Sequence, residues 1–146
     1  PREITATLLR NQWQASGDER DHRRRSVYLF ARRNLRYPLF DLFDRPALAE
    51  SCSQRSISTT APQSLALLNS DIVAKASKAL AQRAREEGGD PQEAIRICFR
   101  RALGRLPKTE EQTAALELVE KSEPMELGLA ALALALFNLN EFIYID

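Results

Sequence analysis

The sequence predicts an all-α fold, an irregular bundle of about four to six helices with a loop-rich N-terminal half. Beyond residue 60, apolar residues recur at spacings of three and four, and short polar residues of the helix-capping type precede the apolar runs. Before residue 60, loop signals divide the chain into short pieces at Ser16-Gly17-Asp18, Tyr37-Pro38 and Arg45-Pro46. We therefore expect a single helical domain, residues 1–146, in which an Arg-rich irregular segment, residues 1–60, packs on a helical bundle, residues 61–146.

The first helix of the bundle is predicted from a capping box. Thr60 is followed three positions later by Gln63. In a capping box the Thr60 hydroxyl accepts a hydrogen bond from the backbone N–H of Gln63, and the Gln63 side chain accepts one from the backbone N–H of Thr60. Gly88-Gly89 ends the pattern. The inner face of this helix would consist of Leu65, Leu68, Ile72, Ala76 and Leu80.

The second helix has the clearest start signal. Asp90 stands at the N-cap, Pro91 at the first helical position and Glu93 behind them, and Gly104 ends the helix. Its inner face would consist of Ile95, Cys98, Phe99 and Ala102.

Two further helices follow. Thr109 with Gln112 forms another capping box, and Glu110 and Glu111 suit the positive end of that helix. The last long helix, from about residue 124 to 138, is apolar almost all round, which predicts a central position among the others.

Two apolar pieces stand out in the N-terminal half. Residues 26–31 fit either a strand or a helix, and we favour a helix. Leu39, Phe40, Leu42 and Phe43 after Pro38 predict a short apolar helix that docks on the bundle.

Composition excludes several classes of protein. The 146 residues include 21 Lys and Arg against 20 Asp and Glu, a net charge of +1 that is untypical of a polyanion binder or a disordered tail. The longest apolar run, Leu127 to Phe137, is too short to cross a membrane. Two cysteines and one histidine cannot form a four-ligand zinc site, and no Cys-x-x-Cys-His motif is present for haem c attachment. We expect no metal or cofactor in this chain.

The N-terminal half is rich in arginine. The guanidinium groups can bind carboxylates or phosphates in a planar, bidentate manner, which suits an acidic partner, an acidic glycan or nucleic acid. The alternative, which we favour, is that they pair with acids such as Asp41 and Asp44 and tie the segment to the bundle. The near-zero net charge weakens the nucleic-acid interpretation further. The arginines concerned are Arg20, Arg23, Arg24, Arg25, Arg32, Arg33 and Arg36.

Other reactive side chains favour structural roles. Cys52 near Arg55 has a setting that could lower a thiol pKa, yet His22 is the sole histidine and no pattern brings it close. Cys98 is expected in the core. The glutamates of the third helix suit a solvated face, and residues 140–144 are expected to pack back on the core as a C-terminal lock.

A combination of motifs resembles a known family. It comprises Arg24 to Leu35, Pro38-Leu39-Phe40, Ser51-Cys52 with Arg55, Thr59 to Gln63, Leu103-Gly104-Arg105 with Pro107, and the ending Asn140 to Asp146. Together these are similar to the planctomycete-specific domain of unknown function that ends many large cytochrome-associated proteins. The resemblance implies the C-terminal part of a larger, exported or periplasmic multidomain protein, with haem c, where present, in upstream domains. The first residue, Pro1 rather than Met, agrees with that expectation.

The sequence does not identify a reaction, and we expect no catalytic residue in this chain. The leading hypothesis is a non-catalytic interaction or scaffolding module that docks on upstream domains, a partner protein or an acidic polysaccharide. Alternatives are an accessory part of a polysaccharide-acting or electron-transfer enzyme, and a nucleic-acid-binding module. By analogy within the family, the residues expected to bind a ligand or partner are Arg24, Arg25, Arg32, Arg33, Asn34, Cys52, Arg55, Thr59 and Gln63.

Overall fold

The structure is a computed structural model that describes residues 16–18, 20–21, 24–28, 42–43 and 61–144. Residues 1–37 and 38–146 form two compact units, and each is described by itself. In the first unit, Ser26–Tyr28 forms one turn of 3-10 helix, η2. The expected packing of segment 1–60 on the bundle stays a prediction, apart from one contact of Leu42 reported below.

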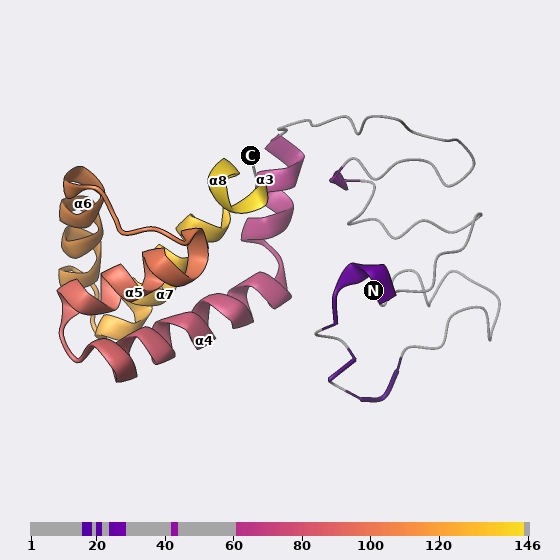
Figure 1. The fold of residues 1–146 in the computed structure, drawn as a ribbon, viewed down its shortest axis with the longest axis horizontal. Coiled ribbons are helices and arrows are strands. Elements are labelled where there is room, and N and C mark those ends of the chain that lie inside the picture. Colours follow the sequence, from indigo (N-terminus) through magenta and orange to yellow (C-terminus); the bar gives the residue numbers. More distant parts are fainter. Residues whose placement is uncertain (1–15, 19, 22–23, 29–41, 44–60, 145–146) are drawn as a thin grey trace. The chain divides into compact units, whose positions relative to one another are not determined.

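The described residues of the second unit form an α-helical bundle (Figure 1). Its helices are α3 (Ala61–Leu68), α4 (Asp71–Gly88), α5 (Pro91–Leu103), α6 (Thr109–Glu120), α7 (Met125–Phe137) and α8 (Asn140–Ile143). No strand occurs among the described residues, so the all-α prediction is confirmed.

Helix α7 occupies the central position that its apolar sequence predicts, because it packs against α4, α5, α6 and α8. The buried core draws on α4 to α7, and no residue of α3 or α8 belongs to it. At the α6–α7 crossing, a Cβ added to Gly128 would lie 2.8 Å from the Cα of Val119, so glycine permits the close approach. The core residues are Ala81, Ala84, Ala94, Ile95, Ile97, Cys98, Phe99, Ala115, Val119, Leu129, Leu132 and Leu136.

Helix α5 begins and ends as predicted. The Asp90 carboxylate accepts hydrogen bonds from the N–H groups of Gln92 (2.9 Å) and Glu93 (3.0 Å). Gly104 ends the helix in the left-handed conformation, with φ of 72°, and its N–H bonds to the Arg100 carbonyl. Both ends follow from local chemistry that the sequence contains.

The prediction of a single helix between residues 60 and 88 is wrong in one respect. The structure has two helices there, α3 and α4, separated at Asn69 and Ser70. The Asn69 side chain donates to the Leu65 carbonyl at 2.8 Å, and Ser70 adopts an extended backbone (φ −79°, ψ 121°) as the N-cap of α4. Asn-Ser-Asp is itself a run of favoured N-cap residues, so the sequence contained this break signal.

The predicted inner face of this region is wrong except for Leu80, which is partly buried and packs against the core. Leu65, Leu68 and Ile72 are 57%, 46% and 70% exposed, whereas the buried residues of α4 are Ser77, Ala81 and Ala84. Helix α4 therefore packs its small residues against the core, which lets its backbone come close to the bulky leucines of α7.

The start of α6 differs from its prediction by one residue. Lys108, rather than Thr109, is the N-cap, and the Glu111 carboxylate accepts a hydrogen bond from the Lys108 N–H at 2.7 Å. The Thr109 carbonyl instead accepts from the Thr113 hydroxyl inside the helix. Glu111 is held in place by Arg105, as described next, which favours the earlier start.

Candidate functional site

Three of the residues expected to bind a ligand or partner, Arg24, Arg25 and Gln63, are among the described residues. Those that lie outside them are Arg32, Arg33, Asn34, Cys52, Arg55 and Thr59. Asp41 and Asp44, expected as partners of the arginines, lie outside them as well.

Arg24 and Arg25 are exposed. The Arg24 Nε lies 3.0 Å from the Asp21 carboxylate, and that carboxylate also accepts the Ser16 hydroxyl at 2.6 Å. This arrangement agrees in kind with the interpretation that arginines of this segment pair with nearby acids. Among residues 16–18, 20–21 and 24–28, no set of cations meets that would define an anion site.

Gln63 is the one buried residue of α3, at 2% exposure. Its Nε2 donates to the Leu42 carbonyl at 2.8 Å, and its Oε1 accepts from the Tyr144 hydroxyl at 3.3 Å. Gln63 thus joins three parts of the chain that are far apart in sequence. This is a connecting role within the unit.

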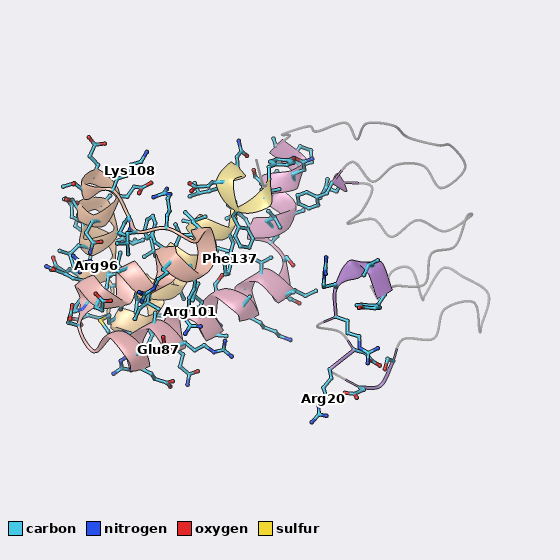
Figure 2. The ribbon with its side chains drawn as sticks, in the orientation of Figure 1. Arg20, Glu87, Arg96, Arg101, Lys108 and Phe137 are labelled. Carbon is cyan, nitrogen blue, oxygen red and sulfur yellow. The ribbon has the colours of Figure 1, made fainter. Side chains whose placement is uncertain are left out.

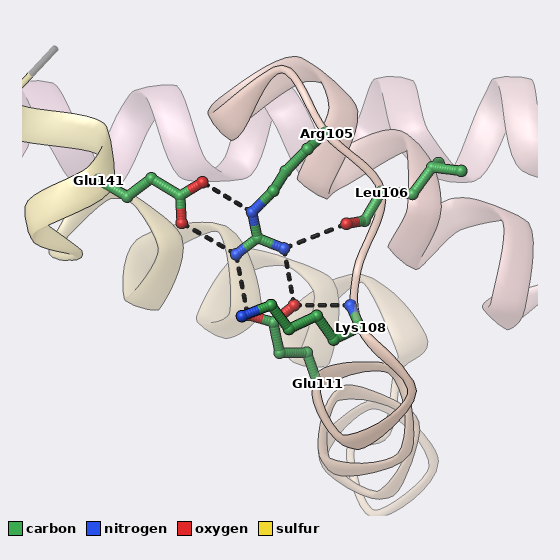
Figure 3. Close-up of polar contacts among 5 residues, drawn as sticks. All are labelled: Arg105, Leu106, Lys108, Glu111 and Glu141. Atoms are coloured by element: carbon green, nitrogen blue, oxygen red, sulfur yellow. Dashed lines mark hydrogen bonds and ion pairs between the residues drawn. The ribbon is translucent and has the colours of Figure 1, made fainter. Parts of the chain in front are cut away.

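Arg105 forms the densest polar network among the described residues (Figure 3). In the sequence, Arg105 is part of a family motif, but no role was predicted for it. Its Nε and Nη2 donate to Glu141 at 2.6 and 2.9 Å. Its Nη1 and Nη2 donate to Glu111 at 2.7 and 2.9 Å, and Nη1 also reaches the Leu106 carbonyl at 3.1 Å. A guanidinium group has five N–H donors, so this network can satisfy all of them.

The electrostatics of this network follow from its geometry. The hydrogen bonds from Arg105, and then from the Lys108 N–H, lower the pKa of Glu111 to about 2. Arg105 likewise lowers the pKa of Glu141, and the two carboxylates raise the pKa of Arg105. The guanidinium carbon also lies 5.7 Å from the Phe99 ring centroid, within cation–π range.

The network connects three elements, because Arg105 follows α5, Glu111 belongs to α6 and Glu141 to α8. Glu141 thus ties the C-terminal residues 140–144 to the bundle through an ion pair, whereas the expected packing on the core is not seen, because α8 has no buried residue. Glu111 and Glu141 are both bonded to one cation and stay ionised, so neither is poised to transfer a proton near neutral pH. A pairing across 36 residues leaves no local pattern in sequence.

Other ion pairs also involve arginines of the bundle. Arg101 on α5 contacts Glu87 on α4 at 2.6 and 2.8 Å (Figure 2), and Arg85 pairs with Glu126. These contacts cross between helices and neutralise cations that could otherwise attract an anionic ligand.

Cys98 is fully buried, and burial raises the pKa of its thiol to about 11. A thiol in this setting is protonated at neutral pH and has no access to a substrate. Within the described part of the chain, no three His, Cys, Asp or Glu side chains meet in a way that could hold a metal ion. None of the described helices is long and apolar enough to cross a membrane.

Three large aliphatic side chains on either side of the α3–α4 junction are exposed, and we call Leu65, Leu68 and Ile72 the α3–α4 face. Its side chains are about half to two-thirds exposed, although their spacing is typical of a helix face that is covered. Lys75, Lys78 and Arg83, further along α4, are exposed, and no described carboxylate pairs with them. Exposed basic residues therefore follow the face along α4.

No curated protein and no solved structure matches the chain. The model of the family PSD1, described as a protein of unknown function (DUF1553), matches residues 2–119. That match includes α3, α4, α5 and nearly all of α6. Because it covers most of the sequence, the chain belongs to the PSD1 family of proteins of unknown function.

Proposed function

We propose that residues 61–144 act as a non-catalytic interaction module that docks another folded domain on the α3–α4 face. The observation that supports this most directly is the exposure of Ile72, at 70%, together with that of Leu65 and Leu68 on the preceding helix. Covering an aliphatic side chain of this size removes apolar surface from water and contributes about 1 kcal/mol or more for each residue.

The charge around this face indicates the chemistry of the partner. Lys75, Lys78 and Arg83 provide three cations on α4, against Asp71 at the helix start and Glu86, which accepts a hydrogen bond from Gln82. A protein surface with an apolar centre and an acidic rim complements this arrangement. Two copies of the face would bring like charges together, so we favour a different domain over self-association.

We propose that this partner is an upstream domain of the same, exported or periplasmic polypeptide. The family resemblance supports the choice. A covalent link raises the effective concentration of the partner, so a small apolar surface with weak intrinsic affinity is enough for docking. In this proposal any haem c belongs to upstream domains, and residues 1–146 dock on them without taking part in the chemistry.

The state of the described reactive groups supports a non-catalytic role. Cys98 is buried and protonated, and Glu111 and Glu141 are both bonded to Arg105. The described ion pairs of Arg24, Arg85 and Arg101 also reduce the case for an acidic polysaccharide or a nucleic acid. A thermal-shift comparison with an acidic glycan and with duplex DNA at two salt concentrations tests those alternatives.

Photo-cross-linking within the full-length protein tests the proposal. A benzophenone amino acid replaces Ile72, and in a matched control it replaces Leu118, an exposed leucine on α6. We expect cross-links from position 72, mapped by mass spectrometry, to an upstream domain, and their loss when Leu65→Asp is added. Equal yields from the two positions, or none from position 72, would contradict docking at this face.

A further inference from the structure

Helix α3 is attached to the bundle in a different way from α4 to α7. Those four helices share the apolar core, whereas no residue of α3 contributes to it. The buried side chain of α3 is instead the polar Gln63, at 2% exposure. Two of its hydrogen bonds run to Leu42 and Tyr144, so polar contacts with distant segments help to position this helix.

The C-terminal end of the chain is held by specific contacts as well. Helix α8 has no buried residue. Glu141 is bonded to Arg105 through both of its carboxylate oxygens, and the Phe142 ring lies 4.8 Å from the Phe137 ring, centroid to centroid. These contacts anchor α8 to the α5–α6 corner and to the end of α7, and they present Tyr144 to Gln63.

We infer that α8 and Tyr144 form a C-terminal latch that holds α3, and with it the α3–α4 face, in position for docking. The sequence of contacts is Arg105 to Glu141, then along α8 to Tyr144, and from its hydroxyl to Gln63. Opening this latch would release α3 while the core of α4 to α7 stays folded. This inference rests on the proposed function, because it concerns how the proposed docking face is presented.

The geometry of the last contact makes the latch easy to open. The distance from the Tyr144 hydroxyl to the Gln63 Oε1 is 3.3 Å, which is long for an O–H···O hydrogen bond. One hydrogen bond makes a small net contribution to the free energy of the closed state. Loss of this bond should therefore speed local opening of α3 by about three- to tenfold.

Hydrogen exchange of the full 146-residue chain tests the latch. The variants are Tyr144→Phe, which removes only the hydroxyl, and Glu141→Gln, which weakens the anchor of α8. Glu120→Gln, on an exposed part of α6, is the matched control. We expect both latch variants to speed the exchange of amides 65–69 by about three- to tenfold, with α5 and α7 unchanged.

Two results would overturn the inference. In one, exchange increases in α8 alone and α3 keeps its wild-type rates. In the other, all helices accelerate equally, which would mean a loss of global stability rather than local release. Because exchange is measured without a partner, failure of the latch is distinguished from failure of docking, which the cross-links from position 72 report.

Discussion

Replacing Arg105 by methionine removes the cation that joins α5, α6 and α8 while keeping an unbranched side chain of similar length. The two carboxylates of Glu111 and Glu141 would then face the same region without their shared partner. Glu111 would retain its hydrogen bond from the Lys108 N–H, and Phe99 would lose its cation–π contact. We expect Arg105→Met to lower the free energy of unfolding of the helical unit.

The size of this effect is limited by solvent. The side chains of Arg105 and Glu111 are 29% and 31% exposed, so their attraction is weaker than that of a buried pair and stronger than that of an isolated surface pair. Hydrogen bonds to charged groups contribute more to stability than neutral ones. We therefore expect Arg105→Met to lower the free energy of unfolding by about 2 kcal/mol. With an ordinary dependence on denaturant, the urea midpoint should fall by roughly 1–2 M.

Urea unfolding followed by circular dichroism measures this change, and α5 offers a matched control. Arg96 makes a single exposed contact with Glu93 at 3.4 Å, so Arg96→Met should lower stability by no more than about 0.5 kcal/mol. Arg105→Lys should recover only part of the stability that Arg105→Met loses. Lysine keeps the positive charge, but it cannot bind two carboxylates bidentately. Equal effects of Arg105→Met and Arg96→Met would refute the assigned role of the network.

The same network predicts how stability depends on pH. The pKa of Glu111 is about 2 in the folded state against 4.5 ordinarily, and the pKa of Glu141 is also lowered. A lowered folded pKa stabilises the protein above the unfolded pKa, and this contribution is lost as pH falls through 4.5 toward 2. Urea midpoints between pH 6 and 2 should therefore fall more steeply for the wild type than for Arg105→Met, and parallel profiles would contradict the argument.

Three further predictions concern the bundle. Asp90→Ala should cost about 1 kcal/mol in urea unfolding because it removes the α5 cap, whereas Ser70→Ala should cost little, since the Ser70 side chain makes no capping bond. Gly128→Ala should cost about 1–3 kcal/mol through its clash with Val119, and an unchanged midpoint would mean that α6 and α7 separate easily. In a Cys52→Ser background, Cys98 should react with a thiol reagent only on unfolding, and rapid labelling of native protein would contradict its burial.

The parts of the fold that could be predicted are those determined locally. Asp90 and Gly104 delimit α5 through side-chain capping and a left-handed glycine, and both signals occupy one or two positions in sequence. The central position of α7 followed from a helix with almost no polar face. In these places a short window of sequence contains the whole physical cause.

The parts that could not be predicted depend on partners remote in sequence. The spacing of Leu65, Leu68 and Ile72 is that of a covered helix face, yet the core selected the small residues Ser77 and Ala81 because α4 lies close to α7. For the candidate site, Gln63 was singled out by analogy within the family, while its bond to Tyr144 spans 81 residues. No local rule connects such positions.

The bundle separates what stabilises it from what we propose it uses for docking. Its apolar core belongs to α4 to α7, and the Arg105 network closes one corner of that core. Helix α3 and the α3–α4 face lie outside both, and polar contacts of Gln63 help to position α3. Substitutions at the face can therefore change binding with little effect on folding, since none of its residues belongs to the buried core. This separation is what a domain needs if its binding partner is to change while its fold is kept.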